Sequence, residues 1–114
     1  FLNDAARSIC GKMVQADLER HDALANGEPW DSSPVLLVDA GPNTHWLEDQ
    51  SLIRQNLRTL LSRFHGRQVE EGADNEIFHW AWLFESTLFV TGETSEAWLA
   101  VCVGLFTHPD FYLY

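Results

Sequence analysis

Apolar residues recur in the middle of the chain at the three-to-four residue spacing that is typical of an amphipathic helix. The stripe contains Ile53, Leu57, Leu60, Leu61 and Phe64. Asn43 or Thr44 offers an N-cap, Glu48 and Asp49 place acids in the first turns, and Gly66 ends the pattern. We therefore expect a helix that begins near residue 43 or 44 and ends before Gly66.

A first helix is predicted over residues 4–25. Asn3 and Asp4 form its N-terminal signal, and Asn26 and Gly27 supply the C-terminal stop. The apolar positions that fit a helical face are Ala6, Ile9, Met13, Ala16 and Leu24.

The segment 77–90, ended by Gly92, fits two secondary structures. Ile77, Ala81, Phe84 and Leu88 follow a helical face, whereas Phe78, Trp80, Trp82 and Phe84 alternate as a strand would. We favour the helix because the segment is long for a strand.

A last helix is expected from Ser95 to Thr107, with Thr94 as its N-cap and Pro109 beyond its end. Apolar residues lie on every side of its stretch 97–103. This pattern is typical of a helix at the centre of a bundle or under a partner.

The connection over residues 27–43 contains Pro29, Pro34 and Pro42 together with glycines and serines. Within it, the run 35–38 is apolar, but it has no evident strand partner and is expected to pack as a strap. The predicted fold is a mainly α single domain, residues 1–114, with about four helices and a long connection after the first.

Charge and hydropathy exclude two classes of function. The net charge is −10, and neither Lys nor Arg follows Arg67. Such a field repels phosphate backbones and favours cationic partners, so we expect no direct nucleic-acid binding. The longest uncharged apolar run, 97–107, is too short to span a bilayer, so we expect no transmembrane segment.

Candidate chemistry is sparse. His45, Glu48 and Asp49 have metal-ligand spacing on a helix, but acids at a helix start are better explained by the helix dipole. Cys10 and Cys102 are compatible with one long-range disulfide or with two buried thiols, and they exclude a c-type haem motif. We expect no catalytic residue, cofactor or metal, and therefore no enzyme.

Aromatic residues are the strongest functional signal. The chain has five Trp and seven Phe, more than so small a core readily encloses, so some should lie at an interface. The interface candidates are Trp80, Trp82, Trp98, Phe111, Tyr112 and Tyr114. The apolar end 111–114 is expected to be tied into the core or into another subunit.

Three segments carry a resemblance to a known family: 53–66, then 76–84, and finally Ala97-Trp98 through Val101-Cys102 to His108-Pro109-Asp110-Phe111 and Tyr114. Together they resemble a family of large secreted bacterial proteins of uncertain function, whose other domains include c-type haem modules. The resemblance implies a periplasmic or extracellular location beside larger, haem-bearing partners.

The leading hypothesis is a non-catalytic accessory or structural subunit that binds other proteins in a larger assembly, which is membrane-associated or haem-containing. The alternative is an acidic inhibitor or immunity-type protein that occupies a basic cleft by nucleic-acid mimicry. The sequence identifies neither the partner nor a small-molecule ligand.

Overall fold

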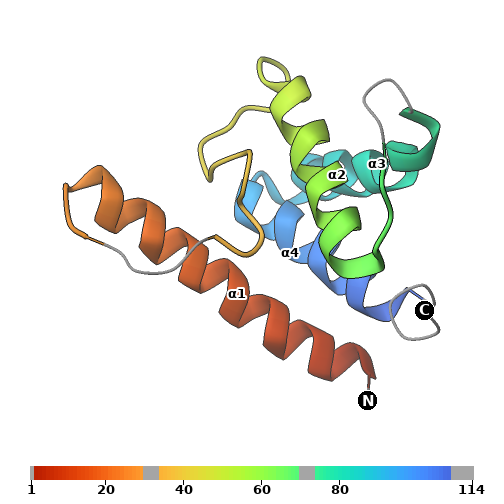
Figure 1. The fold of residues 1–114 in the computed structure, drawn as a ribbon, viewed down its shortest axis with the longest axis horizontal. Helices are drawn as coiled ribbons and strands as arrows, with labels where there is room; N and C mark the ends of the chain where they lie inside the picture. The colour runs from red at the N-terminus through yellow and green to blue at the C-terminus, as the bar shows by residue number, and fades with distance from the viewer. Residues whose placement is uncertain (1, 30–33, 70–73, 109–114) are drawn as a thin grey trace.

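The computed structural model describes residues 2–29, 34–69 and 74–108, and within these ranges it contains four helices and no strand (Figure 1). The helices are α1 (Leu2–Ala25), α2 (Gln50–His65), α3 (Asp74–Thr91) and α4 (Thr94–Thr107). The predicted all-α bundle of about four helices is confirmed.

Helix α4 is the central element, because it packs against each of the other three helices. Trp98, Val101 and Leu105 on one of its faces are fully buried. They meet Leu57 of α2 and Phe84 of α3 in a continuous apolar core. The all-round apolar sequence of this helix therefore agrees with its central place, although its outer face is only half-buried.

The buried face of α1 is displaced by about one residue from the predicted stripe. Ala6, Cys10, Val14 and Asp17 are buried, whereas Ile9 and Leu24 are exposed. The cause is covalent: a disulfide joins Cys10 to Cys102 of α4, with 5.8 Å between their Cα atoms. The disulfide turns this side of α1 toward α4 and settles the pairing that the sequence left open.

Residues 34–41 form an apolar strap between α1 and α2 that two helical side chains hold. The buried Asp17 carboxylate accepts hydrogen bonds from the N–H groups of Val35, Leu36 and Leu37, at 3.0, 2.7 and 2.9 Å. Leu36 and Leu37 are buried in the core. The strap needs no sheet, since a side chain satisfies the backbone groups that a strand partner would otherwise bind.

The predicted start of the second helix was wrong by several residues, since α2 begins at Gln50. Before it, Thr44 Oγ1 accepts a hydrogen bond from the Gly41 N–H, and Asp49 accepts one from the His45 N–H. Such local side-chain bonds compete with helix formation. Trp46 is half-buried between them and packs on Phe84, with ring centroids 5.6 Å apart.

The other helix ends agree more closely with the sequence. Gly66 and Gly92 adopt positive φ after α2 and α3, as expected of residues that end a helix. At the start of α4, Glu93 occupies the N-cap position that was predicted for Thr94. None of the helices in the described ranges combines the length and apolarity needed to cross a bilayer.

Candidate functional site

Helix α3 is apolar on two opposite sides. Ile77, Trp80 and Phe84 are buried in the core. Phe78, Trp82, Phe89 and Val90 are exposed on the outside, with 71, 56, 90 and 81% of their surfaces in water, and we call them the α3 aromatic face. Exposed apolar side chains of this size, gathered on one helix, are the signature of an interaction surface.

The strand-like alternation in the sequence accounts for this arrangement. In a helix, residues four apart share a side, whereas residues two apart point to nearly opposite sides. Phe78 and Trp82 therefore point out, while Trp80 and Phe84 point in. The alternation predicts a half-buried strand in a sheet, but in a helix it predicts one aromatic face for the core and another for solvent.

The α3 aromatic face contains a shallow hollow of about 330 Å³. It is lined by Trp82, Glu85, Ser86, Phe89 and Val90. The exposed Glu85 supplies negative charge at the edge of the hollow, beside apolar rings. A partner that inserts an apolar side chain and carries a cation next to it would fit this hollow.

Charge around the α3 aromatic face is wholly negative in the described part of α3 and α4. Glu85 in the hollow and Glu93 just after the end of α3 are both exposed. Neither helix contains Lys or Arg. The face is therefore electrostatically suited to a basic partner.

Trp80 and Trp98 are corrections to the predicted interface, since both are core residues. Trp98 is fully buried and packs on Phe84 with ring centroids 4.5 Å apart. Trp80 is buried among imidazoles, with its ring centroid 5.8 Å from that of His65 and 5.8 Å from that of His108. Trp80 is covered where α3 packs on α4, and Trp98 projects from α4 into the core, so neither ring offers a surface to a partner.

The remaining interface candidates divide in two. Trp82 lies exposed on the α3 aromatic face, and its role at an interface stays a prediction. Phe111, Tyr112 and Tyr114 lie outside the described residues. Phe89 and Val90 were not among the predicted interface residues, although on a helix their spacing of seven and eight residues from Trp82 indicates a shared side.

The cluster with metal-ligand spacing is not helical. His45 and Glu48 are exposed in the turns before α2, and the Asp49 carboxylate bonds back to the His45 backbone. Within residues 2–29, 34–69 and 74–108, no three His, Cys, Asp or Glu side chains form a metal-binding group.

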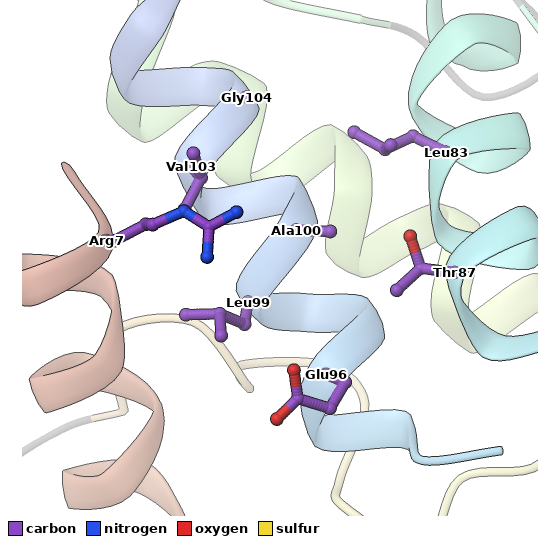
Figure 2. Close-up of a pocket in the computed structure, with 8 residues that line it drawn as sticks. All are labelled: Arg7, Leu83, Thr87, Glu96, Leu99, Ala100, Val103 and Gly104. Atoms are coloured by element: carbon purple, nitrogen blue, oxygen red, sulfur yellow. The ribbon is translucent and has the colours of Figure 1, made fainter. Parts of the chain in front are cut away.

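A second hollow lies on the outer face of α4, between α1 and α3 (Figure 2). Arg7 of α1 and Leu83 of α3 form opposite walls, and Leu99, Ala100 and Val103 form the floor. Its volume is about 380 Å³, within the range of small-molecule sites. It shares no residue with the α3 aromatic face.

Neither a protein-family model, nor a curated protein, nor a solved structure matches the chain. The fold and surfaces define a small all-α protein with an uncovered aromatic helix face.

Proposed function

We propose that the chain is a non-catalytic accessory or structural subunit that binds another protein in a larger assembly through the α3 aromatic face. The exposure of Phe78, Trp82 and Phe89 on one side of a well-packed helix carries the proposal. Trp and other aromatic anchors contribute disproportionately to protein interfaces. Burying each such side chain is worth about 1.5 to 3 kcal/mol, which the isolated chain forgoes.

The chemistry of the partner follows from the rim of the face. Glu85 lies among the aromatic rings and Glu93 follows the end of α3, so an apolar centre flanked by Lys or Arg is the best complement. A second copy of this chain is a poorer complement, because it brings the same acids to the contact and a net charge of −10.

We propose that this subunit is periplasmic or extracellular. The Cys10–Cys102 disulfide supports this location, because such bonds persist in oxidising compartments. The resemblance to secreted proteins with haem modules points the same way and implies a membrane-associated or haem-containing assembly.

The test compares two variants of the tagged full chain for recovery of the native partner. Replacing Trp82 and Phe89 together by Ala removes the centre of the face, whereas Leu47→Ala removes a 75% exposed apolar residue outside it. We expect the double variant to lose at least about tenfold of the recovered partner. The control should retain it, and equal recovery from both variants would contradict the proposal.

The acidic inhibitor hypothesis remains the second candidate, favoured by the exposed acids Glu85, Glu93 and Glu96. Salt separates the two functions, since exposed charge pairs are screened over about 10 Å at 0.1 M salt. Association that collapses at moderate salt and survives the double variant would support nucleic-acid mimicry. Association that survives salt and fails in the double variant would support the accessory subunit.

A further inference from the structure

We propose that the groove on the outer face of α4 binds a small fatty-acid-type molecule, an apolar chain that carries one carboxylate. The groove lies between α1 and α3, with α4 as its floor (Figure 2). This inference does not depend on the α3 aromatic face, because the two surfaces have no residue in common.

The floor of the groove is apolar and lies on the side of α4 that is turned away from the core. Leu99, Ala100 and Val103 are half-buried there, whereas Trp98, Val101 and Cys102 point into the core. The outer face of α4 is thus apolar without being fully covered. A ligand with an apolar chain would remove this surface from water.

Two small residues of α4, Ala100 and Gly104, line the groove. Ala100 leaves room above α4, and Gly104 lets α4 approach α3 closely, because a Cβ at Gly104 would lie 3.0 Å from the Trp80 ring and 3.3 Å from Leu83. The disulfide at Cys10 holds the α1 wall one turn from Arg7. The groove is therefore fixed in shape by the packing of three helices.

Arg7 determines the charge of the ligand. Its side chain reaches from α1 across the groove toward Val103 and Leu99 (Figure 2). No acid of the described residues forms a salt bridge with it, so its guanidinium is available to a carboxylate, the group that its planar fork fits best.

Glu96 limits the ligand to one charge. Its carboxylate lies near the N-terminal end of α4, whereas the Arg7 side chain reaches α4 closer to Val103 (Figure 2). Next to the groove lies a separate hollow of about 200 Å³, which shares the lining residues Glu96 and Leu99 with it and is also lined by Val14 and Leu18 of α1. An apolar tail fits this direction, whereas a second anionic group would meet the Glu96 carboxylate.

The walls favour an acyl chain over a peptide. All residues that line the groove lie in helices, whose backbone groups beyond the first turn are hydrogen-bonded within the helix. A bound peptide would bury amides without partners, at a cost that an acyl chain does not have. The volume of about 380 Å³ also suits a small molecule.

The test is calorimetric titration of the full chain, disulfide intact, with octanoate, octanol and octylammonium. We expect saturable binding in the order octanoate, octanol, octylammonium. The preference for octanoate over octanol should be roughly twofold to fivefold, the range of an exposed ion pair. Arg7→Gln should abolish this preference and leave octanol binding unchanged, and Lys12→Gln, another exposed cation of α1, should change neither.

A variant of the floor tests the position of the tail. Ala100→Leu fills the groove from a half-buried position and should weaken octanoate and octanol alike, with an unchanged melting temperature as the check on folding. The proposal is overturned if none of the ligands binds saturably, if Arg7→Gln keeps the full preference for octanoate, or if Ala100→Leu folds and binds as the original does. Tighter binding of octylammonium would also overturn it and assign the groove to cations through Glu96.

Discussion

Asp17 is the residue on which the order of the strap depends most. Its carboxylate binds three successive N–H groups, those of Val35, Leu36 and Leu37, and Asn56 Oδ1 accepts the next two, from Val38 and Asp39, at 2.9 and 2.7 Å. Asn56 also donates through Nδ2 to the Leu36 carbonyl at 2.8 Å. Two buried polar side chains therefore replace the hydrogen bonds of a sheet.

Replacing Asp17 by Asn should destabilise the fold by about 2 to 4 kcal/mol, because the amide loses one acceptor and leaves buried N–H groups unpaired. Urea denaturation measures the change. Asp22→Asn is the matched control, since Asp22 is an exposed acid of the same helix, and it should stay within about 0.5 kcal/mol. Equal stability of both variants would show that the strap does not need the Asp17 carboxylate.

The roles of Asp17 and Asn56 were not predictable from the sequence. Hydrophobic spacing assigns charged and amide residues to the solvent side of a helix, and the backbone groups that Asp17 and Asn56 bind are about twenty positions away in the chain. The predicted apolar stripe of α2 is confirmed, with Ile53, Leu57 and Leu60 all buried, because packing alone places those residues.

At the scale of elements, the sequence predicted the end of a helix correctly where a glycine ends it. It predicted the start of α2 too early, because local side-chain hydrogen bonds hold the preceding residues in turns. Gly66 ends α2 as expected, since only glycine readily adopts its positive φ of 68°. The start at Gln50 was missed because Thr44 and Asp49 bind local backbone N–H groups in turns. The helix predicted for 77–90 is confirmed. Its helical geometry is what gathers the exposed aromatic residues on the α3 aromatic face.

The contact between α1 and α4 can be tested directly, because reduction breaks the disulfide that joins the two helices. Among the described helices, α1 packs on α4 and is joined to it by a disulfide that spans 92 positions of the sequence. Reduction should lower the free energy of unfolding by about 2 to 5 kcal/mol, because a long loop of the unfolded chain is released.

Urea denaturation with and without dithiothreitol measures this effect. The Cys10→Ala/Cys102→Ala double variant is the control, because its midpoint should match that of the reduced chain and should not respond to the reductant. A midpoint that dithiothreitol does not move in the original chain would contradict a stabilising role for the disulfide.

At the scale of the whole molecule, a compact core leaves two apolar surfaces on different sides of α3 and α4. The aromatic face carries large rings with Glu85 among them, whereas the groove is a hollow with an apolar floor and Arg7 in one wall. The sequence predicted a surplus of aromatic residues but could not assign them, because burial depends on which helix covers which ring. Trp80 and Trp98 became core and Trp82 remained outside for that reason.

Site-specific photo-cross-linking in the native host tests the central claim most directly. A benzoyl-phenylalanine at position 89 replaces a Phe that is 90% exposed on the α3 aromatic face, and the same group at position 47 replaces an exposed Leu outside it. We expect one discrete cross-linked protein from position 89 and none from position 47. The same cross-link from both positions, or none from position 89, would contradict a partner seated on the α3 aromatic face.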